Sequence, residues 1–110
     1  SGHPLERFRN FTKNLAKKIE ALKTIPEGAS VTIAGLLAET KKIFTKKGDP
    51  MMFIKVADES GEIEGVVFPS ALAQFAPLLR PDQCVLIKGR ISHRNGSLSI
   101  ICNSIEPLKE

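Results

Sequence analysis

The chain has 110 residues, of which 42% are hydrophobic, and it carries a formal net charge of +4 with a sequence pI of about 9.3. This length suits a single domain, and the hydrophobic content excludes a chain that is disordered by composition. No apolar run approaches the roughly 20 residues of a membrane span and the N-terminus lacks the apolar core of a secretory signal, so we expect a cytoplasmic protein with no membrane partner.

The first expected element is an amphipathic helix over residues 5–23. Its apolar residues recur at helical spacing on one face, and they are Leu5, Phe8, Leu15, Ile19 and Leu22. Pro26 and Gly28 end the helix. Its other face is basic and carries Arg7, Lys17 and Lys18. The helix either docks on the rest of the chain or a neighbouring domain, or it binds nucleic acid. We therefore divide the chain into an N-terminal helix and linker, residues 1–29, and a domain over residues 30–110.

From residue 30 onward the hydrophobic pattern alternates, which is typical of strands. We expect strands over residues 31–45, 51–57, 62–68, 83–92 and 98–105, and a short helix over residues 69–76. Gly35 indicates a bulge or bend in the long first strand, and Gly61 a positive φ in the turn after the second. Ser70 is a candidate N-cap, and the Asn-Gly pair at 95–96 predicts a hairpin.

This order of elements predicts an all-β fold: a five-stranded OB barrel with a helix between the third and fourth strands. An SH3-like barrel is the main alternative, but it has no reason to place a helix there. The charges within this domain are segregated. Residues 41–47 hold four lysines and no acid, whereas residues 58–64 hold four acids and no base. One end of the barrel should therefore be basic and the other acidic.

Catalytic motifs are absent from the sequence. His3 and His93 stand far apart, and no His/Cys set has the spacing of metal ligands. Cys84 and Cys102 fit no disulfide framework, so we expect two buried thiols. Asp58 with Glu62 or Glu64 reads most simply as a solvated hairpin end. We therefore expect a monomeric binding module with no cofactor or metal, and not an enzyme.

Three sequence stretches resemble a known family: "TKKGDPM-F" (45–53), "D-SG-IE-VVFP" (58–69) and "VL-KGR-S" (85–92). They resemble the OB-fold domain in the C-terminal part of the alpha subunit of bacterial DNA polymerase III, and the opening "SGHPL" is similar to the segment before that barrel. Single motifs are shared with the anticodon-binding domains of class II aminoacyl-tRNA synthetases. The resemblance implies a fragment of a DNA-directed DNA polymerase, whose catalytic carboxylates lie in a separate palm domain. It also implies that this barrel holds single-stranded template, with other polymerase domains and replisome subunits as partners.

The candidate nucleic-acid site follows from where OB folds bind, along the second and third strands between the first and last hairpin loops. Both loop tips should lie at one end, where Lys46, Lys47 and Arg94 converge. Phe53 should stack a base and Lys55 contact phosphate. The full predicted set is Lys41, Lys42, Lys46, Lys47, Phe53, Lys55, Lys88, Arg90, His93 and Arg94.

Other readings of this set remain open. Phe53 could instead cover the barrel flank beneath the N-terminal helix, Lys55 could pair with Glu64 across strands, and His93 reads more simply as a turn residue. The predicted function is single-stranded DNA binding. The alternatives are a tRNA anticodon-binding domain and a protein-interaction domain within the polymerase. The chain has six Phe and neither Trp nor Tyr, so binding should be weak.

Overall fold

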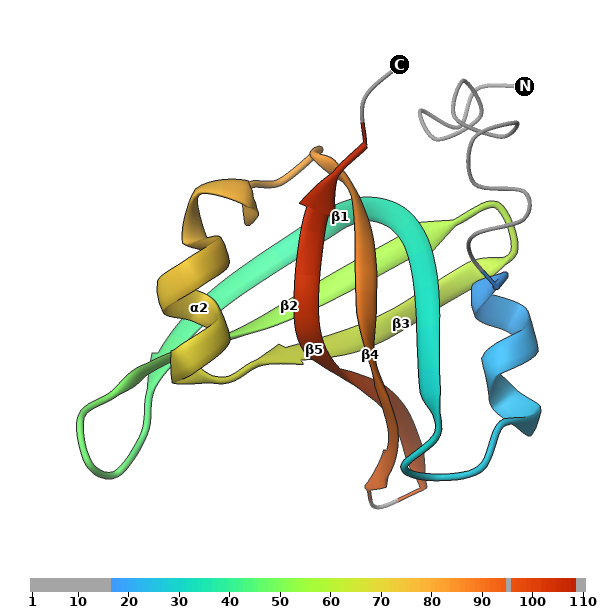
Figure 1. Ribbon diagram of the computed structural model, residues 1–110, viewed down its shortest axis with the longest axis horizontal. Coiled ribbons are helices and arrows are strands. Elements are labelled where there is room, and N and C mark those ends of the chain that lie inside the picture. The colour runs from blue at the N-terminus through green and yellow to red at the C-terminus, as the bar shows by residue number, and fades with distance from the viewer. Residues whose placement is uncertain (1–16, 95, 109–110) are drawn as a thin grey trace.

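The computed structural model describes residues 17–94 and 96–108, which form a small barrel with short helical segments on its outside (Figure 1). The strands are β1 (Ser30–Phe44), β2 (Pro50–Asp58), β3 (Gly61–Val67), β4 (Cys84–Arg94) and β5 (Ser97–Pro107). The helical segments are the 3-10 helix η2 (Ile19–Thr24), the α-helix α2 (Pro69–Phe75) and the 3-10 turn η3 (Ala76–Leu78). Within the described residues, no helix is long and apolar enough to cross a membrane.

The five strands close into a barrel in the order β1-β2-β3-β5-β4. β3 and β5 pair in parallel through three residues each, and all other neighbours are antiparallel. The helix α2 lies between β3 and β4 in the chain and buries Leu72 against the barrel core. The predicted all-β OB barrel, with its helix after the third strand, is confirmed.

β1 pairs with two different strands. Its first half, Ser30–Leu36, pairs with β4, and its second half, Leu36–Phe44, pairs with β2. The register with β2 shifts between Leu37 and Glu39. We predicted a bulge or bend at Gly35, and the observed bulge lies slightly beyond that residue. Gly35 has a different role: a Cβ there would collide with the Val56 side chain and lie 2.9 Å from the carbonyl oxygen of Ala57. The absent side chain lets β1 and β2 approach closely.

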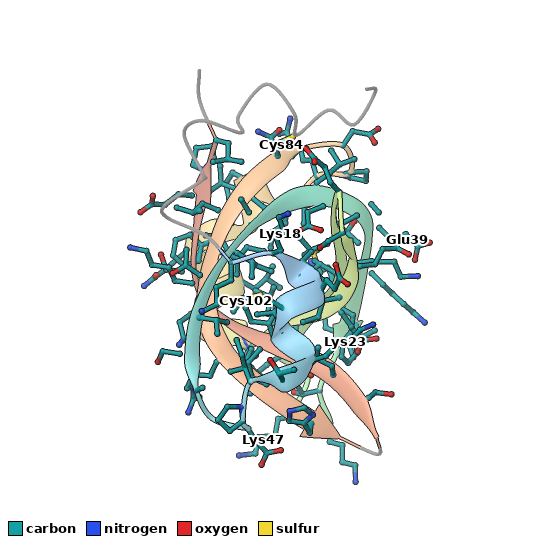
Figure 2. The ribbon with its side chains drawn as sticks, turned by 90° about the vertical axis from the view of Figure 1, so that its right-hand side faces the viewer. Lys18, Lys23, Glu39, Lys47, Cys84 and Cys102 are labelled. Carbon is teal, nitrogen blue, oxygen red and sulfur yellow. The ribbon has the colours of Figure 1, made fainter. Side chains whose placement is uncertain are left out.

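The barrel interior is filled by aliphatic side chains from all five strands and from η2. The largest fully buried ones are Leu22, Ile33, Leu37, Ile87, Ile91, Ile100, Ile105, Val56, Val67 and Val85. Cys84 and Cys102 are both buried, as predicted, and Figure 2 labels both residues. Burial raises the pKa of the Cys102 thiol to about 12, because the thiolate would lose its hydration inside the apolar core.

The segment before β1 differs from the predicted continuous helix over residues 5–23. Lys17 forms a parallel bridge to Ile33, with its amide donating to the Thr32 carbonyl at 2.8 Å, and Lys18 has extended backbone. From Lys17 onward, where the structure describes the chain, helical structure begins at Ile19; residues 5–16 of the predicted helix lie outside the described part. Ile19 and Leu22 on η2 are buried in the same core as the strands, so this turn docks on the barrel.

The acidic turn between β2 and β3 is built around one carboxylate, that of Asp58. Its Oδ1 accepts hydrogen bonds from the Ser60 amide (2.7 Å), the Ser60 hydroxyl (2.6 Å) and the Gly61 amide (3.1 Å). Its Oδ2 accepts the Ile19 amide at 2.8 Å, and the Ser60 hydroxyl oxygen accepts the Glu20 amide at 3.0 Å. Asp58 thus binds η2 to the turn, so the reading as a merely solvated hairpin end is wrong for this residue.

Two further local predictions are corrected. Gly61 has no positive φ, because Asp58 closes the turn with its side chain and leaves Gly61 as the first residue of β3. Ser70 is not the N-cap of α2: the helix begins at Pro69, whose fixed φ suits its first position, and Phe68 occupies the cap position. The β4–β5 hairpin is confirmed, with Arg94 paired to Ser97 and Gly96 at a φ of 77°.

Gly89 on β4 offers a direct test of how closely β4 and β5 approach each other. A Cβ there would collide with the Ile101 carbonyl oxygen and lie 3.0 Å from the carbonyl carbon, and backbone cannot yield as a side chain can. We expect Gly89→Ala to lower the free energy of unfolding, measured by urea denaturation, by about 2–4 kcal/mol. Gly61→Ala is the matched control, since nothing lies within 4 Å of its added Cβ and its stability should not fall. Equal stability of the two variants would contradict the close β4–β5 approach.

Candidate nucleic-acid interface

The outer surface of the barrel is organised by strand alternation into rows of side chains that run across the strands. Three adjacent rows cover the face formed by β1, β2 and β3, and two of them continue around the barrel onto β5 or β4; we name each row after one member. The Phe53 row contains Lys41, Phe53, Val66, Ile101 and Arg90; the Phe68 row contains Ile43, Met51 and Phe68; the Lys55 row contains Glu39, Lys55, Glu64 and Ser99.

The Phe53 row has an apolar centre and a cation at each end. Phe53 pairs with Lys41 on one side and with Val66 on the other, and the row continues through Ile101 to Arg90 on β4. Phe53, Val66 and Ile101 are half-buried, whereas Lys41 and Arg90 are exposed. The predicted outward position of Phe53 is therefore confirmed, with part of its ring accessible to solvent.

The Phe68 row lies between the Phe53 row and the basic β1–β2 loop. Ile43 pairs with Met51, and Phe68 follows Val67, whose partner Met52 is next to Met51. Phe68 is 44% exposed. Our prediction did not include Phe68, although the alternation that places Ile63 and Val67 inside also places it outside.

The Lys55 row is acidic on balance. Lys55 lies opposite Glu64 on β3 and opposite Glu39 on β1, and its ammonium group is 3.8 Å from a Glu39 carboxylate oxygen. The register therefore supports the cross-strand alternative for Lys55, with two glutamates in place of one. Figure 2 shows the Glu39 side chain directed away from the barrel. An anionic ligand at Lys55 would face both carboxylates.

The β1–β2 loop presents two exposed lysines, Lys46 and Lys47, at its tip. The turn is closed by the Thr45 amide donating to the Asp49 carbonyl at 2.8 Å, and Gly48 supplies the positive φ of 89° that this turn needs. The loop lies at the end of β2 opposite the acidic β2–β3 turn, as predicted (Figure 1).

Lys41 and Lys42 point to opposite faces of β1, because neighbouring residues on a strand alternate. Lys41 belongs to the Phe53 row, whereas Lys42 lies over the ring of Phe44, with its ammonium nitrogen 5.7 Å from the ring centroid. Phe44 is 66% exposed and pairs with Pro50 on the face that continues the barrel interior. Only one of these two predicted lysines therefore shares a face with Phe53.

The remaining predicted residues are on β4 and do not join Lys46 and Lys47. Lys88 pairs with Thr32 and Ser104, outside the three rows. The backbone of Arg94 pairs with Ser97, beyond Ser99 of the Lys55 row, so the acidic row separates the two loop tips along the strands. Figure 1 shows the two loops apart on the lower side of the molecule. The predicted convergence of the loop tips is wrong.

His93 is held by the linker that leads into β1. Its amide donates to a Glu27 carboxylate oxygen at 3.0 Å, and its Nε2 lies 3.2 Å from the Ile25 carbonyl oxygen, to which a protonated Nε2 donates. Two backbone hydrogen bonds join the linker and β4 nearby: the Gly28 amide donates to the Ile91 carbonyl, and the Ile91 amide donates to the Ala29 carbonyl. These bonds give His93 a role in fixing the linker against β4.

A comparison with protein families matches residues 13–108 to the OB-fold nucleic acid binding domain. Among curated proteins, the chain is 35% identical over 89 residues to the DNA polymerase III subunit alpha of Aquifex aeolicus. The aligned region covers 81% of this chain and 8% of that protein. It is 31% identical to the same subunit of Bacillus subtilis over 112 residues, which covers 100% of this chain. The chain thus spans only 10% of the length of the Bacillus subtilis protein.

Solved structures share the barrel at low sequence identity. The mitochondrial single-stranded DNA binding protein Rim1 of S. cerevisiae superposes with a TM-score of 0.61 at 15% identity, over 76% of this chain and 97% of that one. The asparaginyl-tRNA synthetase of Entamoeba histolytica superposes with a TM-score of 0.63 at 21% identity, over 79% of this chain and 22% of that one. At these identities the likeness concerns the fold, whereas the family match covers most of the chain. This chain belongs to the family of OB-fold nucleic acid binding domains.

Proposed function

We propose that this chain binds single-stranded DNA and acts as the template-holding module of the alpha subunit of a bacterial DNA polymerase III. The observation that carries the proposal is the Phe53 row, an apolar and aromatic centre with Lys41 at one end and Arg90 at the other. A single strand offers the complement of this arrangement, because its bases stack on aromatic rings and its phosphates pair with cations. The similarity to polymerase alpha subunits supports the context.

In this proposal the bases lie over the outer face of β2 and β3, and the backbone follows the cations. A base stacks on Phe53, while Lys41, Lys46 and Lys47 attract the phosphates on the side of the β1–β2 loop. The Lys55 row repels phosphate and so limits the site on its other side. The chain performs no chemistry in this role, and other domains of such a polymerase supply the catalytic groups.

The first prediction concerns ligand class. The 110-residue chain should bind labelled oligo-dT more tightly than duplex DNA of equal length, weakly and with little dependence on sequence, because the face offers rings and cations but no element that enters a groove. Fluorescence anisotropy with oligo-dT, oligo-rU and duplex DNA at one salt concentration measures this. Equal or tighter binding to the duplex would reject the proposal, and a clear preference for oligo-rU would favour an anticodon-type RNA reader.

The second prediction concerns the loop lysines. Each phosphate neutralised on a single strand contributes a slope of roughly −0.7 to log K against log salt, so Lys46→Ala with Lys47→Ala should flatten the slope by up to about 1.4. Both side chains are exposed, so the thermal midpoint should stay within about 2 °C. Binding of oligo-dT measured from low to physiological salt gives the slope.

The matched control is Lys17→Ala with Lys18→Ala, which also removes two exposed lysines. The β1–β2 loop and η2, which follows these lysines, lie on opposite sides of the molecule in Figure 1. The slope of the control should stay close to wild type. An unchanged slope for the loop variant, or equal flattening by the control, would mean that the β1–β2 loop does not contact the strand.

The third prediction concerns Phe53. Phe53→Ala should weaken oligo-dT binding by about 1–3 kcal/mol, the usual effect of losing one base stack. Because most of the side chain is covered beside Val66, the free energy of unfolding should fall by about 1–2 kcal/mol. Phe53→Leu should keep the stability but recover only part of the affinity. A large loss of stability with unchanged binding would show that Phe53 only covers the barrel flank.

A further inference from the structure

A second phenylalanine lies on the same outer face as Phe53. Among the described residues, Phe68 and Phe44 are the large hydrophobic residues that are exposed, at 44% and 66%. Phe68 follows directly after β3, where its extended backbone, with φ of −71° and ψ of 163°, continues the alternation of the strand. It is two residues beyond Val66, the partner of Phe53, so Phe53 and Phe68 are diagonal neighbours on adjacent strands.

The diagonal spacing suits two separate bases. Diagonal neighbours on adjacent strands are about 7–8 Å apart, and long or aromatic side chains there remain within reach of each other. This is roughly twice the 3.4 Å rise of a stacked strand. Two successive bases at this spacing do not stack on each other. Each base stacks instead on one of the two phenylalanine rings. Splayed bases on aromatic side chains are the usual form of single-strand recognition.

We infer that Phe68 is a second base-stacking residue, and that the site takes two successive nucleotides, one on Phe53 and one on Phe68. This inference rests on the proposed function and adds a residue and a site size to it. Ile43 and Met51, both half-buried, continue the apolar surface beside Phe68. Their row adjoins the β1–β2 loop, so the phosphate of the second nucleotide lies on the side of Lys46 and Lys47.

The same rows explain why the stacking surface ends after two rings. On the far side of the Phe53 row stand Glu39 and Glu64, the two partners of Lys55. Neither carboxylate offers a stacking surface, and both repel a phosphate. On the near side the β1–β2 turn ends the sheet. The aromatic surface is thus bounded by like charge on one side and by the end of the strands on the other.

The test compares Phe68→Ala with Phe44→Ala, each removing one exposed phenylalanine. Phe44 lies next to Ile43 on β1 and therefore faces away from the Phe68 row, with Lys42 over its ring. Anisotropy titrations use oligo-dT and an abasic strand of equal length, which has the phosphates and sugars but no bases. Phe68→Ala should weaken oligo-dT binding about 5- to 100-fold, the range expected for one stack, and Phe44→Ala should stay within about twofold.

The abasic strand separates stacking from other effects. Phe68→Ala should bind it as wild type does, whereas the Lys46→Ala, Lys47→Ala double variant should bind it more weakly. Phe68→Leu guards against a folding defect, since it keeps the apolar volume and should still bind oligo-dT several-fold more weakly than wild type.

Binding of oligo-dT within twofold of wild type by Phe68→Ala, beside a clear loss for Phe53→Ala, would overturn the second stack and leave the proposed function standing. An equal loss on the abasic strand would overturn it too, because the ring would then act on the backbone or on the fold. If Phe53→Ala, Phe68→Ala and the lysine double variant all bind as wild type, the proposed function fails together with this inference.

Discussion

The register shift in β1 between Leu37 and Glu39 decides which side chains of this barrel meet the solvent. Uninterrupted alternation would place Leu37, Glu39 and Lys41 on one face, because they are two residues apart. Leu37 is fully buried, so Glu39 and Lys41 would then point into the core. The additional residue at the bulge reverses the alternation and turns both charged side chains outward. The bulge lies where β1 passes from β4 to β2, so barrel closure and the outer face of the site depend on the same irregularity.

The charges on this face act through contrast between rows. Lys55 has a carboxylate partner on each side, and at 3.8 Å from Glu39 in an exposed setting the pair is worth about 1 kcal/mol or less. Its contribution to stability is small, yet it leaves Lys55 with little net attraction for a phosphate. Lys41, one row nearer the loop, faces Phe53 and has no acidic cross-strand partner on β2. The basic segment 41–47 and the acidic segment 58–64 thus each contribute a side chain, Lys41 and Glu64, to two adjacent rows on the surface.

Much of this fold follows from the sequence. Alternating hydrophobicity locates the five strands, and the helix between the third and fourth distinguishes the OB barrel. Alternation also places Phe53 outside, and would have placed Phe68 there. The failures have a common cause: Asp58 acts on η2, 39 residues away in sequence, and a bulge separates the faces of Leu37 and Lys41. Local patterns carry no information about partners distant along the chain. The hairpin register made Glu64 predictable as a partner of Lys55, whereas the separation of the loop tips and the second partner, Glu39, were inaccessible.

The composition of the outer face sets how such a site works. Phenylalanine offers a ring without a hydrogen-bonding group, and the chain contains neither Trp nor Tyr. A base stacked on Phe53 is therefore held by its π-face, which every base has, and not by the edges that distinguish one base from another. In the proposed complex, the exposed cations of that row, Arg90 and Lys41, face phosphates, which are also the same in every nucleotide. In a template-holding module both properties favour movement of the strand. No base sequence binds so tightly that it stops the strand, and the few weak contacts can break and re-form as the strand advances by one nucleotide.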